Sequence, residues 1–120
     1  MYWVDRGTDR IRRANLDGSD VQDLARGLVR PDKLALDLEG GKMYWTAGLG
    51  EIQRANLDGS NVEGLVTARS EPRGIALDLD GGRMYWTDSG TDTIQSANLD
   101  GSDIRTLVTG VAGPTSIALE

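Results

Sequence analysis

The sequence contains no cysteine, no histidine and no phenylalanine. Without cysteine, it has neither a disulfide framework nor a thiolate metal site. Without histidine, it lacks the commonest catalytic base, the commonest transition-metal ligand and the side chain that changes charge near neutral pH. The hydrophobic share is 38 %, below the ~45–50 % of ordinary globular chains. These absences remove the most frequent catalytic and metal-binding designs.

Two further features are missing, an excess of positive charge and a long apolar run. The formal net charge is −6, so we expect no basic face for nucleic acid. No stretch approaches the ~18 apolar residues of a membrane-spanning helix. The N-terminus has no charged leader followed by an apolar core, so no signal peptide is expected.

Repetition dominates what is present. Met-Tyr-Trp opens three copies of one unit, which begin 42 and 41 residues apart (43 − 1 and 84 − 43). Each copy continues with a glycine-bearing loop, an alternating stretch ending in Ala-Asn-Leu, and Asp-Gly-Ser. A fixed period of ~40 residues predicts a repeat architecture. We therefore divide the single domain, residues 1–120, into repeats 1–42, 43–83 and 84–120.

Two tight turns divide the repeats into short segments. Asp-Gly at 17–18, 58–59 and 100–101 predicts type I′ hairpin turns with positive φ at both central residues. Gly-Gly at 40–41 and 81–82 predicts a second hairpin. Residues 19–29 are also compatible with an amphipathic helix, but their copies at 61–67 and 103–109 carry glycine or β-branched residues. We therefore predict three strands there.

A proline loop precedes the last strand of each repeat, at Pro31, Pro72 and Pro114. The segments after these loops alternate small and aliphatic residues, and we predict strands at Leu34–Leu38, Ile75–Leu79 and Ile117–Glu120. Each unit then has four short antiparallel strands and no helix. An all-β chain with this period fits three blades of a β-propeller.

The motifs themselves resemble a known repeat. Tyr85-Trp86-Thr87-Asp88, together with residues 97–102 and 74–78, is similar to the YWTD repeat of low-density lipoprotein receptor class B propellers. The resemblance covers the whole chain three times. It implies a six-bladed propeller, usually extracellular or at the cell surface, that acts without catalysis as a protein- or peptide-binding module or as an intramolecular docking module. Val4 replaces the threonine of the motif in repeat one. Ala47 replaces its aspartate in repeat two, so a polar role of that aspartate is not uniform around the ring.

The bulky and acidic residues of the motif suggest structural roles. Tryptophan and tyrosine bring a large amphipathic area, so each tryptophan is expected to fill the seam between neighbouring blades. The aspartate that follows is expected to accept hydrogen bonds from backbone amides of its loop.

Three blades make half of the ring that the resemblance implies. We expect the first blade to lack an inner strand and the last inner strand to lack a blade. Two chains related by a two-fold axis, a C2 homodimer, solve both problems and couple folding to dimerisation. The expected closure residues are Met1, Tyr2, Trp3 and Val4 of one chain and Ile117, Ala118 and Leu119 of the other. The alternative is a piece of a longer propeller.

Catalysis and metal binding find little support. The loops 5–9 and 88–92 each hold two carboxylates four residues apart. They could share a calcium ion or bond their own backbone, and we expect no other cofactor or metal. We assign no catalytic residue. A metal-dependent, lactonase-like hydrolase is the least favoured function because the asparagines that could face an axial metal are expected beside the outer hairpins, at positions 15, 56, 61 and 98.

This leaves a binding surface as the expected functional feature. The chain direction predicts the proline loops and the loops after the motif on one face, and both hairpin sets on the other. By the resemblance, partners bind that first face near the channel mouth. The candidates are Arg6, Asp9, Arg10, Asp32, Lys33, Leu49, Glu51, Glu71, Arg73, Thr91, Asp92 and Thr115. The alternative is a structural or engineered self-assembling unit with no ligand of its own.

Overall fold

The computed structural model describes residues 1–120 and contains eleven strands and no helix. They are β1 (Tyr2–Asp5), β2 (Arg10–Arg13), β3 (Gln22–Ala25), β4 (Leu34–Asp37), β5 (Lys42–Ala47), β6 (Glu51–Asn56), β7 (Glu63–Val66), β8 (Pro72–Asp78), β9 (Arg83–Asp88), β10 (Thr93–Asn98) and β11 (Arg105–Thr109). The ambiguous segments after the Asp-Gly turns are strands β3, β7 and β11, as predicted. A helix of the length and apolarity that crossing a membrane requires is not found.

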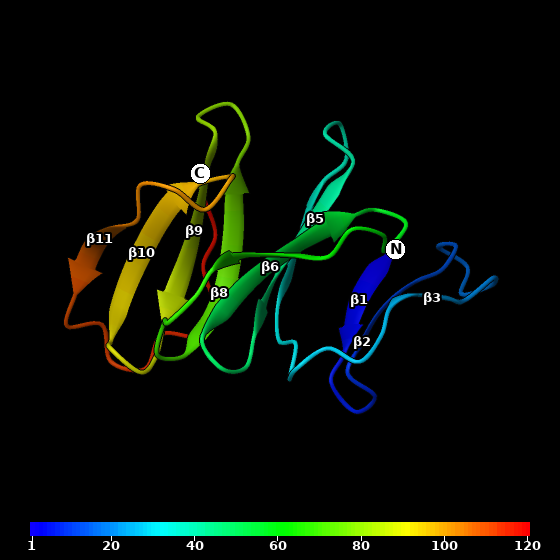
Figure 1. Cartoon of the computed structure of the whole chain (residues 1–120), viewed down its shortest axis with the longest axis horizontal. Coiled ribbons are helices and arrows are strands. Elements are labelled where there is room, and N and C mark those ends of the chain that lie inside the picture. The colour runs from blue at the N-terminus through cyan, green and yellow to red at the C-terminus, as the bar shows by residue number, and fades with distance from the viewer.

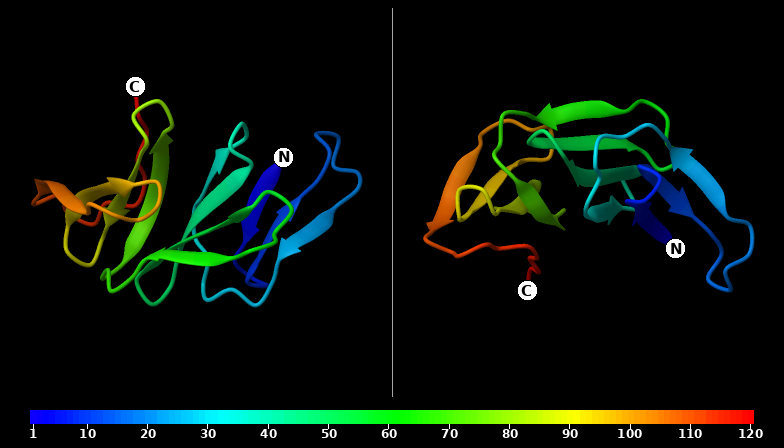
Figure 2. Two further views of the ribbon diagram at one scale, coloured as in Figure 1. Left: turned by 45° about the horizontal axis from the view of Figure 1, so that its top comes forward. Right: turned by 90° about the horizontal axis from the view of Figure 1, so that it is seen from below.

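The strands form three antiparallel sheets that stand side by side as separate blades (Figure 1). Their strand orders are β1-β2-β3, β4-β5-β6-β7 and β8-β9-β10-β11. The all-β blade architecture is therefore confirmed. The blades follow a curved arc, with both chain termini on its concave side (Figure 2, right). The first sheet has three strands, because β1 pairs with β2 and its other edge has no partner within these residues.

The core lies in the two seams between blades. In the first seam, Ile11 and Ala25 of the first blade pack with Met43 and Trp45 of the second. In the second seam, Tyr44 and other residues of the second blade pack with Trp86 of the third. Both tryptophans are fully buried. Their predicted role as seam fillers is confirmed, and it makes each blade dependent on its neighbour.

The Asp-Gly hairpins are confirmed, but the predicted turn type is wrong. In the first, the amide of Gly18 donates to the carbonyl of Asn15 (2.9 Å) and the amide of Asn15 to that of Ser19 (2.9 Å). Only glycine has a positive φ, with 85° at Gly18, and Asp17 does not. This is a three-residue loop with a glycine bulge. Asp17 accepts hydrogen bonds from both the amide and the hydroxyl of Ser19, which favours this geometry over a type I′ turn. The turns at 58–59 and 100–101 repeat it.

The strand predicted at Ile117–Glu120 is also wrong, since residues 110–120 form none. The segment passes close to β8, where a Cβ added to Gly74 would meet the Cα of Ser116 at 2.7 Å. However, no backbone hydrogen bond joins this segment to the edge strand β8 or to any other strand. A strand is defined by a ladder of such bonds, so a strand-like sequence that forms no ladder remains irregular.

Candidate functional site

Backbone hydrogen bonds sort the loops onto two faces. On one face the amide of Gly48 donates to the carbonyl of Val29 (2.8 Å), which ties the loop after the motif to the proline loop. On the other, the amide of Leu57 donates to the carbonyl of Gly41 (3.1 Å), which joins the two hairpin sets. The predicted division is confirmed. We call the first of these surfaces the loop face, formed by the β1–β2, β3–β4, β5–β6, β7–β8 and β9–β10 loops.

The aspartate of the motif organises the loop face in the third blade. Asp88 is fully buried. Its carboxylate accepts hydrogen bonds from the amides of Glu71 (2.9 Å) and Ser70 (3.1 Å) in the proline loop, and from Gly90 (3.0 Å) in its own loop. One side chain thus joins two loops, as a buried acceptor must find donors. Its predicted role as an acceptor of loop amides is confirmed.

The equivalent aspartate of the first blade is less enclosed. Asp5 accepts from the amides of Gly7 (3.1 Å) and Thr8 (3.2 Å). Hydrogen bonding from Thr8, first by its side chain, holds the pKa of Asp5 below its usual 3.8. The carboxylate is therefore the form that the loop stabilises, and no donor from a neighbouring proline loop reaches it.

The second blade lacks this aspartate, and its loop is built differently. Arg30 lies against Gly48, where an added Cβ would meet the arginine Nε at 2.7 Å. The next residue, Leu49, has a φ of 67° and is 72 % exposed. A bulky residue in this left-handed region is strained, and such strain concentrates at functional sites. The loops of repeats one and three are one residue longer, and their left-handed aspartates at positions 9 and 92 correspond to Gly50, since the carbonyls of all three residues accept the equivalent backbone amide of the next loop.

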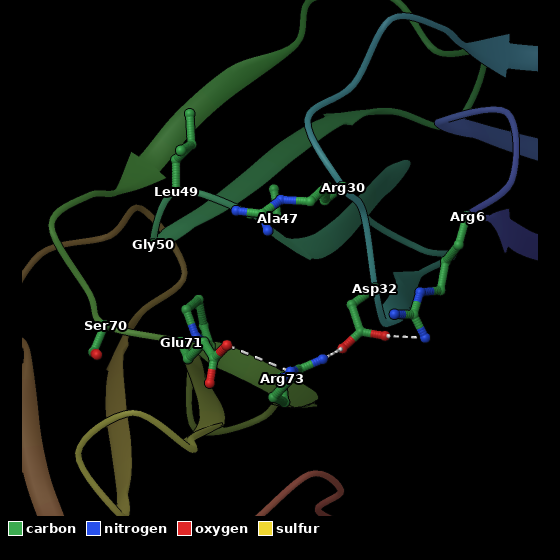
Figure 3. A pocket seen from close by; sticks show the side chains of 11 residues that line it. Arg6, Arg30, Asp32, Ala47, Leu49, Gly50, Ser70, Glu71 and Arg73 are labelled. Atoms are coloured by element: carbon green, nitrogen blue, oxygen red, sulfur yellow. Dashed lines mark hydrogen bonds and ion pairs between the residues drawn. The ribbon is translucent and has the colours of Figure 1, made fainter.

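An ion-pair network crosses all three blades on the loop face (Figure 3). Asp32 lies within 3.6 Å of Arg6 and 3.4 Å of Arg73, and Arg73 lies 3.5 Å from Glu71. Lys33 approaches the same carboxylate at 3.6 Å. The side chain of Asp32 is only 11 % exposed, whereas that of Arg6 is 64 % exposed. The network therefore has a buried acidic centre and an exposed, largely basic rim.

Backbone contacts hold this network in position. Thr46 donates from its hydroxyl to the carbonyl of Arg73 (2.6 Å), and its backbone carbonyl accepts from the amide of Asp32 (2.9 Å). Thr46 is itself completely buried. The charged residues from different blades thus share one rigid attachment in strand β5.

A pocket of about 320 Å³ opens over the network (Figure 3). Its walls include five of the predicted residues, Arg6, Asp32, Leu49, Glu71 and Arg73. Lys33 joins them through its ion pair with Asp32. The pocket also includes Arg30 and Ser70, which sequence reasoning missed. Their positions just before Pro31 and Glu71-Pro72 in the proline loops were the available signal.

The other candidates lie away from this pocket. Arg10 pairs with Asp23 of β3 (2.6 Å), and Glu51 accepts from Gln53 (2.8 Å). Asp92 accepts from the amide of Gly113 (2.9 Å). The remaining members, Asp9, Thr91 and Thr115, do not line the pocket either.

In the two loops considered for calcium, residues 5–9 and 88–92, the first aspartate accepts hydrogen bonds from backbone amides. In residues 88–92, Asp88 accepts from loop amides, whereas Asp92 accepts from Gly113 on the other side. No group of three or more acidic side chains is placed to hold a metal ion. Calcium binding at these loops remains a prediction.

The asparagines lie where they were expected. Asn15 donates from its side-chain amide to the hydroxyl of Ser19 (3.1 Å), and Asn56 and Asn98 do the same in the other two outer turns. Asn61 donates to Glu63 (3.0 Å) at the start of β7. Their amides therefore stabilise the hairpins and belong to the face opposite the pocket.

The residues expected to close a ring lie at the two outer surfaces of the arc. Trp3 is half-buried and has the guanidinium of Arg12 5.9 Å from its ring centroid. Leu119 lines a second hollow of about 620 Å³ with Tyr85 and Leu77 of the third blade. Each group thus borders a surface that no other blade of this chain covers.

The family described as low-density lipoprotein receptor repeat class B matches residues 1–38 and 82–119. Two curated relatives align locally. A low-density lipoprotein receptor-related protein 5-like protein from Homo sapiens is 48 % identical over 46 residues, which cover 37 % of this chain and 18 % of the relative. Low-density lipoprotein receptor-related protein 5 from Mus musculus is 45 % identical over 47 residues, or 38 % of this chain and 3 % of the relative.

Solved structures align over nearly the whole chain. A chain in the crystal structure of a nidogen/laminin complex superposes with a TM-score of 0.88 at 35 % identity, covering 96 % of this chain and 46 % of that one. TolB from Agrobacterium tumefaciens shares the fold with a TM-score of 0.78 at 20 % identity, covering 96 % of this chain and 47 % of that one. A gluconolactonase from Xanthomonas campestris also shares it, with a TM-score of 0.72 at 22 % identity, covering 91 % of this chain and 37 % of that one. The chain spans less than half the length of each of these proteins.

Proposed function

The chain belongs to the low-density lipoprotein receptor class B repeat family, and we propose that it is a non-enzymatic, protein- or peptide-binding module. The observation that carries this proposal is the network of Arg6, Asp32 and Arg73 with its pocket. It draws charged side chains from three blades to one concave place on the loop face. A concave site with convergent polar groups is the usual form of a binding site.

The exposure of the side chains suits a protein partner. Arg6 and Glu71 have side chains that are 64 % and 58 % exposed, and Leu49 is 72 % exposed beside them. An apolar side chain surrounded by charged groups of both signs matches the apolar centre and polar rim of protein interfaces. We propose a location outside the cell or at its surface, and the family membership supports this part of the proposal.

Binding is tested with immobilised laminin, the protein named with the structural relative, and with a phage-displayed random peptide library. We expect binding by the native chain and its loss, by about tenfold or more, in Leu49→Asp. We expect this variant to keep the fold because Leu49 is 72 % exposed and aspartate tolerates a positive φ better than leucine does. Leu38→Asp, on a 65 % exposed leucine of the opposite face, is the control. Equal binding by both variants, or none by the native chain, contradicts the proposal.

The proposal includes completion of a six-bladed ring by a second copy. Its support is the pair of uncovered outer surfaces described above, at β1 with Trp3 and beside Leu119. Light scattering and sedimentation at micromolar concentrations are expected to give twice the 12.9 kDa chain mass. A folded species with the mass of one chain contradicts ring formation.

The absence of catalysis is part of the same proposal. The carboxylates of Asp88 and Asp5 accept hydrogen bonds from backbone amides, so these residues have a structural role. The likeness to a gluconolactonase is one of fold at 22 % identity. Lactone hydrolysis measured with and without added calcium or zinc is expected to stay at the uncatalysed rate. Metal-dependent turnover that purifies with the chain would contradict it.

A further inference from the structure

The outer half of each internal seam is made by an Asp-Gly turn that packs against the preceding blade. In the first seam, Leu57 packs against the core, and a Cβ added to Gly59 would collide with the backbone carbonyl of Leu24. The second seam repeats this arrangement with Leu99, Gly101 and Leu65. A glycine is required because no side-chain atom fits between turn and strand.

An arginine of the preceding blade completes this contact. Arg54 donates to the carbonyl of Leu99 (3.2 Å) across the second seam. The pKa of Asp100 is lowered, first by its hydrogen bonds with Ser102 and also by the charge of Arg54. In the first seam the charge of Arg13 also lowers the pKa of Asp58, after the hydrogen bonds from Ser60, but the Arg13 guanidinium donates to Gln22 (2.8 Å) and not to the carbonyl of Leu57.

The turn of the first repeat has the same sequence but nothing to pack against. Leu16 is 89 % exposed, and a Cβ at Gly18 would meet no atom within 4 Å. The pKa of Asp17 is lowered by Ser19, with no arginine contributing. We call residues Asn15–Ser19 the free turn.

The third blade offers the surface that lacks a turn. Val108 is 43 % and Leu107 is 50 % exposed, although Val66, at the position of Val108 in the second blade, is 1 % exposed. In the second blade the arginine, Arg54, lies on β6, whereas in the third blade the arginine, Arg105, lies on the outer strand β11. Ser96 stands at the position of Arg54, and its neighbour across the ladder is Arg105, whose side chain is 63 % exposed. Ser96 itself is buried and accepts a hydrogen bond from Arg83 (2.7 Å). We call the exposed residues Arg105, Leu107 and Val108 the open socket.

We propose that the free turn of one copy docks in the open socket of a second copy, with Leu16 and Gly18 against β11 and Arg105 bonding the Leu16 carbonyl. This inference rests on the proposed ring and adds its outer contact, which is separate from the inner-strand closure at Met1–Val4 and Ile117–Leu119. A second copy is the occupant because the two surfaces carry the two halves of a contact that the chain makes twice internally. Their charges also match, since docking brings Arg105, which pairs with Asp103 (2.8 Å) in the single chain, close to Asp17 of the free turn.

The test compares Leu16→Asp with Leu38→Asp by sedimentation and light scattering of the full chain. Both leucines are highly exposed in hairpins, so both variants should fold, which circular dichroism and thermal melting check. Leu38 lies between two blades of the chain and is still 65 % exposed, so it is not a seam residue. We expect Leu16→Asp to weaken self-association by about tenfold or more, because one charge enters an apolar contact. We expect Leu38→Asp to match the native chain.

The outcomes separate this inference from the ring. If the native chain and both variants form the same dimer, the docking of the free turn is wrong and the ring survives. If the native chain forms longer open assemblies that Leu16→Asp disperses, the docking is right and ring closure is wrong. If the native chain is monomeric, with the free turn solvated or reserved for another partner, both proposals fail.

Arg105 provides an independent check. Arg105→Ala should weaken association about fivefold, since one charge-assisted hydrogen bond is lost. The double variant Ser96→Arg with Arg105→Glu rebuilds the Arg54–Glu63 pair of the second blade, whose atoms lie 2.8 Å apart. It should associate at least as tightly as the native chain. Because Ser96 is buried, thermal melting checks the fold of the double variant. Association that is unchanged in Arg105→Ala, or lost in a double variant that melts like the native chain, overturns the assigned role of this arginine.

Discussion

The internal seams and the outer surfaces of the arc contain the same residue types in different surroundings. Trp45 and Trp86 are completely buried, whereas Trp3, the same residue of the same motif, is half-buried beside Arg12. Tyr44 is 2 % exposed, but Tyr85 lines an open hollow. The motif therefore supplies packing surface, and the neighbouring blade decides whether that surface is buried. Stability in such arrays is the sum of blade and interface contributions.

Truncating the motif tryptophan should give the largest difference in stability between an internal seam and an outer surface. Trp45→Ala is expected to lower the free energy of unfolding by about 3–5 kcal/mol, since it leaves a cavity in a closed seam. Trp3→Ala should cost little in dilute solution and more as protein concentration rises, if a second copy covers it. Denaturant unfolding at several concentrations measures both. Equal, concentration-independent losses would mean that Trp3 is already packed within one chain.

Removing the motif aspartate should have the next largest effect. Asp88→Ala leaves buried amides of two loops without an acceptor and should cost about 2–3 kcal/mol. Asp5→Ala should cost clearly less, because its own exposed loop and the more distant Arg12 (3.5 Å) lose an acceptor that water replaces. Thermal unfolding compares them. Amide hydrogen exchange should rise at Ser70 and Glu71 in the first variant; unchanged exchange there would contradict the role assigned to Asp88.

The turn glycines sharpen the comparison further. Gly59→Asn should cost about 1–2 kcal/mol more than Gly18→Asn in dilute solution. Both positions need a positive φ, but only Gly59 lies against a neighbouring backbone. Gly27→Asn is the control, because Gly27 has a positive φ and open space, and alanine takes its place in the second repeat. Equal costs at 18 and 59 would show that backbone conformation alone matters.

The smallest expected effect is a change in carboxyl pKa values when the arginine that crosses the second seam is removed. Arg54→Gln should raise the pKa of Asp100 and of Glu63 toward their usual values and leave Asp17 unchanged, because only the first two face this arginine. Carboxyl NMR titration measures it. Lowered pKa values mean that these carboxylates stabilise the fold above their unfolded-state pKa. That contribution is lost as the pH falls through the lower folded-state values. A shift at Asp17 would contradict the assigned partners.

Much of the fold was predictable because most sequence features occur in three copies, which can be compared with one another. The strand in residues 19–29 could have been a helix, and its copies at 61–67 and 103–109 decided the question correctly. The turn type at Asp-Gly was missed because the hydrogen bonds of Asp17 with Ser19 compete with the φ preference of the dipeptide. On the loop face, residues adjacent to proline and glycine were predictable as exposed. Their grouping around Asp32 was not, since it depends on where three separate blades meet.

The sequence by itself determined the repeat, the strand positions, the packing role of tryptophan and the acceptor role of the motif aspartate, because these follow from local periodicity and side-chain chemistry. Only the tertiary structure decided which copies of these residues are buried, why Ile117–Glu120 forms no strand, and that Arg6 and Arg73 share one carboxylate. Burial and ladder pairing require a neighbour, and a neighbouring blade or strand is a property of three-dimensional arrangement.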